Sequence, residues 1–233
     1  MILKQFISNL HFREWRNWQL ASAEFSVQAY VPSLWQEFCI ELPELIEKSV
    51  EKRQAEHLAG RYLVKELQRQ LDIHQATISN AADRSPIWPQ GSSGSISHSR
   101  GSVWAGLSQN AEMSLGLDVE QFFSEKQVRE LGGQLLSNEE MQWLRNQSLP
   151  LSLAYALAFA GKESLYKALY PDCQQLKEFT AAQVIGVSST QIELRLTEDW
   201  SSNWSAGQSI VMDYWQSDEM VWVACEVTRR SRA

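Results

Sequence analysis

Apolar residues occupy every second position from Met113 to Val119, with polar or small residues between them. This period of two predicts a β-strand with one face turned to a core. Asp118 and Glu120 lie two residues apart, so the strand presents both carboxylates on the same face. Two neighbouring carboxylates repel each other. Either both meet solvent at an exposed strand edge, or a divalent cation such as Mg²⁺ binds between them.

A helical period runs through residues 151–170, which are rich in Leu, Ala, Phe and Tyr. Pro150 and Pro171 flank this segment, and we expect them to mark the two ends of the helix. Glu163 and Lys167 are four residues apart and share a helix face, as in an exposed ion pair worth about 0.2–0.5 kcal/mol. The segment is apolar almost all round, however, which predicts burial. Buried charges need partners, because an unpaired buried charge is costly.

A second helical pattern extends from Glu44 to Leu71 and carries a basic stripe. Arg53, His57 and Arg61 recur on it every four residues. Arginine binds phosphate well, because its fork of N–H donors matches the phosphate oxygens. A solvated basic face is the alternative explanation.

Residues 83–101 combine a loop punctuated by proline with a short strand. Arg84 lies in the loop and is a candidate phosphate contact. The strand at 95–98 runs into a turn at Arg100-Gly101. His98 has small polar neighbours, which makes it a candidate for ligand binding, although a lone histidine is more often structural.

The chain divides into two α+β halves, which we place at residues 1–112 and 113–233. The first half contains a predicted extended segment at 25–31, and a capping box at 137–140 predicts the start of a helix in the second half. The remaining predicted strands lie at 103–108 in the first half and at 182–187, 191–197, 208–215 and 220–227 in the second.

Composition narrows the class of protein. The 233 residues are 44% apolar, as in a globular protein, and the net charge of −7 argues against nucleic acid as the main partner. No run of 18 apolar residues occurs, so we expect no membrane span. The first residues also lack the apolar core of a signal peptide. Cys39, Cys173 and Cys225 are far apart and odd in number, which favours unbridged thiols in a reducing cytoplasm.

Two motifs supply the candidate chemistry. They are G-L-D-V-E at 116–120 and F-A-G-K-E-S-L-Y-K at 159–167, which together contain three carboxylates and two lysines. Such a set suits a hard cation that holds phosphate oxygens. The motifs therefore predict chemistry at a phosphate ester.

Four segments, taken in order, resemble the Sfp/EntD-type 4′-phosphopantetheinyl transferases, and the EntD-like branch most closely. The segments are K-R-x-x-E-x-L-A-G-R at 52–61, R-x-P-x-W-P-x-G with G-S-I-S-H-S at 84–99, G-L-D-V-E at 116–120 and K-E-S-L-Y-K-A-L at 162–169. Ala160 stands where many members have Ser or Thr, and no departure touches a charged motif position. The resemblance implies an α+β fold of two similar halves with pseudo-twofold symmetry and the active site between them.

That family moves the 4′-phosphopantetheine arm of coenzyme A to a serine of an acyl or peptidyl carrier protein and releases adenosine 3′,5′-bisphosphate. The resemblance implies that Lys167 contacts the pyrophosphate, and that Lys162 organises the acidic cluster or the transferred phosphate. The implied Mg²⁺ ligands are Asp118, Glu120 and Glu163, and the implied coenzyme A contacts in the first half are Arg53, Arg61, Arg84, Ser97 and His98.

The implied chemistry agrees with the residues. Attack on a phosphate ester needs an in-line nucleophile and neutralisation of the developing charge, which Mg²⁺ and lysines supply. Glu163 is the candidate base for the serine proton, directly or through water. The alternatives are another metal-dependent phosphoester hydrolase and a non-catalytic coenzyme A-binding module. Siderophore, nonribosomal peptide, polyketide and fatty acid synthesis all remain open as the source of the carrier, and we expect a cytoplasmic monomer.

Overall fold

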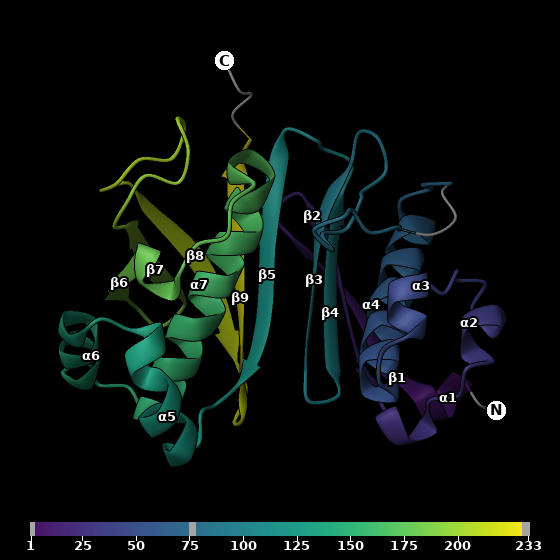
Figure 1. Ribbon diagram of the computed structural model, residues 1–233, viewed down its shortest axis with the longest axis horizontal. Coiled ribbons are helices and arrows are strands. Elements are labelled where there is room, and N and C mark those ends of the chain that lie inside the picture. The colour runs from purple at the N-terminus through teal and green to yellow at the C-terminus, as the bar shows by residue number, and fades with distance from the viewer. Residues whose placement is uncertain (1–2, 75–77, 230–233) are drawn as a thin grey trace. The chain divides into compact units, whose positions relative to one another are not determined.

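The computed structural model describes residues 3–74 and 78–229, and the chain forms two compact units, residues 1–111 and 112–233. Each unit combines helices with one antiparallel sheet, which confirms the α+β class (Figure 1). The pseudo-twofold relation between the halves stays a prediction. In the described residues no helix is both long and apolar enough to cross a membrane. Cys39, Cys173 and Cys225 form no disulfide.

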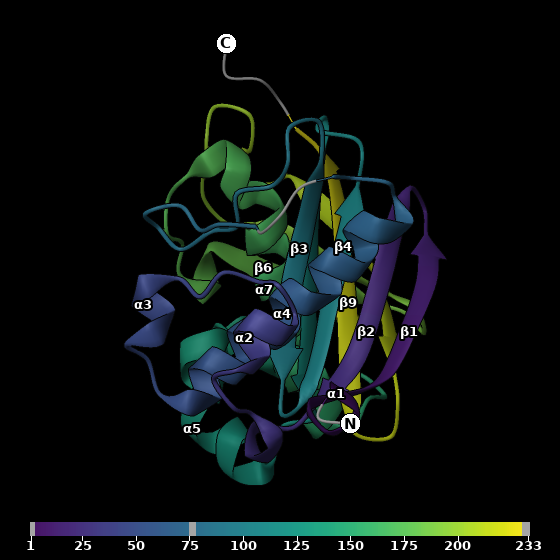
Figure 2. The same ribbon diagram turned by 90° about the vertical axis from the view of Figure 1, so that its right-hand side faces the viewer.

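The first unit is a four-stranded sheet in the order β1-β2-β4-β3, with the helix α4 packed on one face (Figure 2). Leu58 and Leu63 of α4 meet Val103 and Ala105 of β4 in one apolar core. The elements are α1 (Leu3–Phe6), β1 (Ile7–Trp15), β2 (Trp18–Phe25), α2 (Leu34–Glu37), α3 (Glu44–Glu47), α4 (Glu51–Gln70), β3 (Ser93–Ser99) and β4 (Ser102–Ser108), with a 3-10 turn at Val27–Ala29.

The helix predicted from Glu44 to Leu71 is broken between α3 and α4, because Val50 has an extended backbone. The side-chain amide of Gln54 stabilises the break. It donates to the carbonyl oxygens of Glu47 (3.0 Å) and Ser49 (2.9 Å). Neither proline nor glycine occurs at this break, so the sequence pattern did not indicate it.

The extended segment predicted at 25–31 is also wrong. β2 ends at Phe25, and the 3-10 turn that follows is closed by a hydrogen bond from Tyr30 N–H to the Val27 carbonyl (3.2 Å). The strands predicted at 95–98 and 103–108 are confirmed as parts of β3 and β4. The turn at Arg100-Gly101 is confirmed, with φ of 44° and 84°.

The second unit is a five-stranded sheet in the order β5-β9-β8-β7-β6, and the long helix α7 lies along β5 and β9 (Figure 1). The four strands predicted after residue 181 are confirmed. The elements are β5 (Met113–Gln121), α5 (Glu125–Leu135), α6 (Asn138–Arg145), α7 (Leu151–Cys173), β6 (Ala182–Val187), β7 (Gln191–Leu196), β8 (Ser209–Gln216) and β9 (Met220–Thr228), with a 3-10 turn at Phe179–Ala181.

The helix ends in this unit follow local chemistry. The capping box is confirmed at the start of α6, where Ser137 Oγ accepts from Glu140 N–H (3.1 Å). Pro171 does not end α7, which continues to Cys173. In the last turn the missing proline N–H removes only one helical hydrogen bond. The helix ends instead at Gln174, which is left-handed (φ 51°) and donates to the Tyr170 carbonyl (2.8 Å).

Candidate active site

Gly116 in β5 lies directly against the backbone of α7. A Cβ atom at this position would be 1.7 Å from the carbonyl oxygen of Ser164 and 2.9 Å from the backbone nitrogen of Ala168, so only glycine fits. Ser164 Oγ also donates to the carbonyl of Val223 in β9 (2.9 Å). Helix α7 is therefore held at one register on β5 and β9. Nothing in the sequence pattern indicated this role for Gly116 or Ser164.

This close approach brings the predicted carboxylates together. Asp118 follows Gly116 by two residues in β5, and Glu163 precedes Ser164 in α7. Burial raises the pKa of Glu163, Lys167 lowers it, and the charges of Asp118 and Glu120 raise it further. Asp118 is only 6% exposed, so the alternative of a solvated strand edge is wrong for this residue.

Lys167 reaches across from the helix to the strand. Its Nζ donates to Asp118 Oδ1 (2.6 Å) and to the Leu117 carbonyl (3.1 Å). Glu120 Oε1 accepts from the backbone N–H of Gln121 (2.8 Å). We call Asp118, Glu120, Glu163 and Lys167 the acidic group, because the charges of the other three all act on Glu163. Across residues 3–74 and 78–229, no three Asp, Glu, His or Cys side chains are gathered closely enough to hold a metal ion.

Lys162 has a different set of partners from Lys167. Its Nζ donates to Glu140 Oε2 (2.9 Å) and to the Leu135 carbonyl (2.7 Å), and both side chains are buried. Glu140 Oε1 accepts in turn from Val184 N–H (2.8 Å). Burial lowers the pKa of Lys162, and Glu140 opposes this shift. The capping-box signal located Glu140 in the sequence, but nothing local indicated its burial or its pairing with Lys162.

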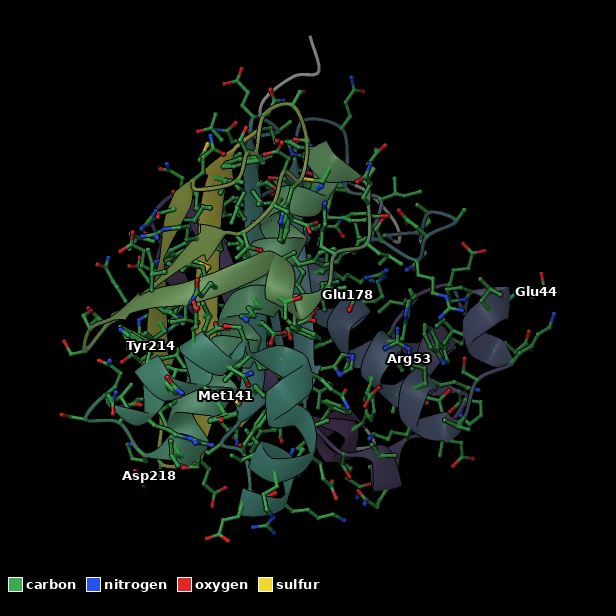
Figure 3. The ribbon with its side chains drawn as sticks, turned by 60° about the vertical axis from the view of Figure 1, so that its left-hand side comes forward. Glu44, Arg53, Met141, Glu178, Tyr214 and Asp218 are labelled. Atoms are coloured by element: carbon green, nitrogen blue, oxygen red, sulfur yellow. The ribbon has the colours of Figure 1, made fainter. Side chains whose placement is uncertain are left out.

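A pocket of about 160 Å³ opens beside Glu163 in the same unit. Three aromatic residues, Tyr166, Phe179 and Trp200, are among those that line it. Glu178, which also lines the pocket, is labelled in Figure 3. The acidic group therefore has an aromatic pocket next to it.

In the first unit, α4 packs closely on β3. A Cβ atom on Gly60 would be 2.8 Å from Ile96 Cγ2. His98 lies two residues further along β3 on the same face. Its Nε2 is 3.3 Å from an Arg53 guanidinium nitrogen, and its Nδ1 is 3.9 Å from Glu56 Oε1. Figure 3 shows Arg53 on α4.

The stripe on α4 is not a solvated face, because His57 and Arg61 are buried. One Arg61 guanidinium nitrogen donates to Asn80 Oδ1 (2.8 Å). Burial and the charge of Arg53 lower the Arg61 pKa to about 10, and burial followed by the charges of Arg61, Arg53 and His98 lowers the His57 pKa to about 3. We call Arg53, His57, Arg61 and His98 the basic group.

Two other candidates from the sequence lie around this group. Arg84 has a left-handed backbone (φ 71°), and its carbonyl accepts from Asn80 Nδ2 (2.6 Å). Ser97 is buried and points to the opposite face of β3 from His98, because successive strand side chains alternate. Arg84 is thus tied to the basic group through Asn80, whereas the Ser97 side chain is not part of it.

Comparison with known proteins covers most of the chain. Residues 41–107 match the family described as 4′-phosphopantetheinyl transferase N-terminal domain, and residues 114–220 match the 4′-phosphopantetheinyl transferase superfamily. These ranges contain the acidic group, the basic group and Asn80.

Individual relatives agree with this assignment. Enterobactin synthase component D of Salmonella typhimurium is 34% identical over 171 residues, which are 73% of this chain and 70% of that protein. The protein of the same name from Escherichia coli is 32% identical over 168 residues, 72% and 79% of the two chains. 4′-Phosphopantetheinyl transferase Npt of Nocardia iowensis is 31% identical over 131 residues, 54% and 56% of the two chains. With its acidic and basic groups on the motif positions, the chain belongs to the 4′-phosphopantetheinyl transferase superfamily.

Proposed function

We propose that this protein transfers the 4′-phosphopantetheine arm of coenzyme A to a serine of an acyl or peptidyl carrier protein, and that adenosine 3′,5′-bisphosphate is released. The observation that carries the proposal is the acidic group, in which Asp118 and Glu163 are brought together by the Gly116–Ser164 contact. The basic group supports it, because its buried arginine suits a phosphate-rich ligand.

We propose that Asp118, Glu120 and Glu163 hold Mg²⁺, which requires their side chains to move closer together than they lie in this structure. The donor set fits, because hard carboxylate oxygens are the protein ligands that Mg²⁺ prefers. The charge also fits, since the group holds three carboxylates and one lysine: burial raises the pKa of Glu163, Lys167 lowers it, and Asp118 and Glu120 raise it. When bound, Mg²⁺ would neutralise charge on the pyrophosphate. Loss of Mg²⁺ affinity in Glu120→Gln, measured by calorimetry without substrate, tests this ligand set; unchanged affinity would argue against it.

The other charged residues take distinct roles in this proposal. Lys167 is the pyrophosphate contact, and its Asp118 partner holds it between strand and helix. Glu163 is the base that accepts the serine proton. Lys162 is a positioning residue, because Glu140 and the Leu135 carbonyl already engage its ammonium group inside the protein. It fixes α7 against α5, α6 and β6.

The pocket beside Glu163 is the proposed site for the pantetheine arm. The arm is a chain of methylene groups interrupted by amides, so it suits a wall of aromatic rings with polar groups at its edge. Phe179 and Tyr166 provide such a wall, and Lys177 and Glu178 provide polar groups. The arm would then extend from the acidic group without leaving the second unit.

The decisive experiment mixes the protein with coenzyme A, Mg²⁺ and a panel of apo-carrier proteins. Mass spectrometry of the carrier detects the added arm, and chromatography detects adenosine 3′,5′-bisphosphate. Because two relatives are named as components of enterobactin synthase, a siderophore carrier domain is the first choice in the panel. Release of the bisphosphate without any carrier would indicate a hydrolase. Coenzyme A binding without transfer to any carrier would indicate a binding module.

A further inference from the structure

The loop that carries Arg84 is closed by its own hydrogen bonds. Ile87 N–H donates to the Ser79 carbonyl (3.0 Å), and Ala81 N–H donates to the Ser85 carbonyl (2.9 Å). A third bond runs across the tip, from Arg84 N–H to the Ala81 carbonyl (2.9 Å). The loop therefore has a defined backbone, and Arg84 takes its left-handed conformation at the tip.

Asn80 joins this loop to helix α4. Its Nδ2 donates to the Arg84 carbonyl (2.6 Å), and its Oδ1 accepts from an Arg61 guanidinium nitrogen (2.8 Å). The oxygen of the Asn80 amide is therefore bonded to helix α4, and its nitrogen is bonded to the loop. Arg61 and Arg84 are separated by 22 intervening residues in the sequence, and this single side chain connects them.

The chemistry of the amide matters for Arg61. The Arg61 side chain is 6% exposed, and no carboxylate forms an ion pair with it in the described part of the chain. Its Nε has no hydrogen-bond partner in that part of the chain. A neutral acceptor such as asparagine orients the guanidinium without cancelling its charge, whereas an aspartate would neutralise it. An oriented, uncompensated and buried cation is suited to a phosphate group.

We propose that Asn80 is a positioning residue for phosphate binding, because it holds Arg61 and the Arg84 loop in one fixed arrangement. The inference rests on the proposed function, in which Arg61 serves a phosphate-rich ligand, and on the expectation that Arg84 contacts coenzyme A. Asn80 itself acts through its two neighbours. A long arginine side chain that is already fixed loses less conformational freedom when the ligand binds, and this strengthens binding.

The test measures binding of adenosine 3′,5′-bisphosphate by titration calorimetry, and KM and kcat for coenzyme A with a carrier protein. In Asn80→Ala both hydrogen bonds are lost. We expect the bisphosphate to bind about tenfold more weakly, the size expected for loss of one hydrogen bond to a charged group. KM for coenzyme A rises by a similar factor, and kcat stays close to the wild-type value because the acidic group is intact.

Asn80→Asp separates orientation from charge. It keeps the acceptor for Arg61 but loses the donor to the Arg84 carbonyl and places a negative charge beside the guanidinium. We expect binding to weaken at least as much as in Asn80→Ala, while the Arg61 contact keeps this variant folded. Gln109→Ala is the matched control, because it removes one side-chain bond to the Leu71 carbonyl (3.1 Å) in the same unit and should leave both KM and binding unchanged.

The outcomes distinguish this inference from the proposed function. If wild-type protein transfers the arm and Asn80→Ala binds the bisphosphate as tightly as wild type, the role of Asn80 is refuted and the function stands. If kcat falls while KM is unchanged, or Gln109→Ala weakens binding equally, the positioning role is also refuted. If wild-type protein binds no bisphosphate and transfers no arm, the proposed function itself fails.

Discussion

The contact between Gly116 and Ser164 gives the sharpest test of how the acidic group is built. The substitution Gly116→Ala adds one methyl group that would lie 1.7 Å from the Ser164 carbonyl oxygen and 2.6 Å from its carbonyl carbon. Ordinary contact begins at 3.4 Å, so the atoms must separate by about 1.7 Å (3.4 less 1.7). The obstacle is backbone, and a side-chain rotation cannot remove it.

The expected cost follows from this geometry. Adding a methylene group to a packed core typically costs about 1–3 kcal/mol, mostly through side-chain and small backbone shifts. Here the strand β5 must move away from the helix α7 that covers it. We therefore expect the free energy of unfolding to fall by about 3 kcal/mol or more. The movement also separates Asp118 on the strand from Glu163 on the helix. Transfer activity should therefore fall together with stability.

Urea unfolding followed by circular dichroism gives the free energy of unfolding for wild type and Gly116→Ala. Gly133→Ala in α5 is the matched control, because nothing lies within 4 Å of the added methyl group. We expect that control to be more stable by about 0.5–1 kcal/mol, since alanine favours a helix over glycine. A Gly116→Ala protein within about 0.5 kcal/mol of wild type, the usual range for surface substitutions, would show that β5 and α7 are not in such close contact.

Three further predictions concern the buried pair, the buried histidine and the pocket. Lys162→Met leaves the Glu140 charge buried alone and should lower the free energy of unfolding in urea by about 3–5 kcal/mol. Adding Glu140→Gln to this variant should recover part of the lost stability. If the losses of the two single variants simply add in the double variant, the two residues are not coupled. The pKa of His57 is about 3 in the folded protein and 6.5 in its ordinary state. As the pH falls from 6.5 toward 3, the unfolded chain binds a proton that the folded protein does not, so the stability decreases. Between pH 7 and 5 this group should cost about 2 kcal/mol, and His57→Phe should remove that part of the slope; an unchanged slope would argue against the shift. Phe179→Ala should raise KM for coenzyme A and leave the affinity for adenosine 3′,5′-bisphosphate, which lacks the arm, unchanged; equal weakening of both would place the arm elsewhere.

The sequence correctly located the helices, strands and turns that are determined by residues close together in the chain. The capping box at Ser137 predicted the start of α6, and the apolar segment at 151–170 predicted most of α7. The turn at Arg100-Gly101 and the late strands also follow from short patterns. Two strands were missed for a physical reason. The edge strand β1 is exposed on both faces over much of its length, and β2 is largely buried on both, so neither shows a clean period of two.

The charged motifs were visible in the sequence as residue types and spacings, which were sufficient to indicate phosphate chemistry and a family. Their partners were not, because each partner is distant along the chain. The spacing along the helix indicated Glu163 as one possible partner for Lys167, but not Asp118, which lies 49 residues away and accepts its hydrogen bond. Lys162 was expected near the acidic cluster, and the structure instead pairs it with Glu140.

Tertiary packing therefore determined which charges meet. Spacing along one helix or strand fixes only which residues share a face, and that much can be deduced from the sequence. Which element lies opposite depends on close approaches such as Gly116 against Ser164 and Gly60 against Ile96. These contacts join segments that no local pattern connects. The acidic and basic groups take their burial, their hydrogen bonds and their shifted pKa values from that packing.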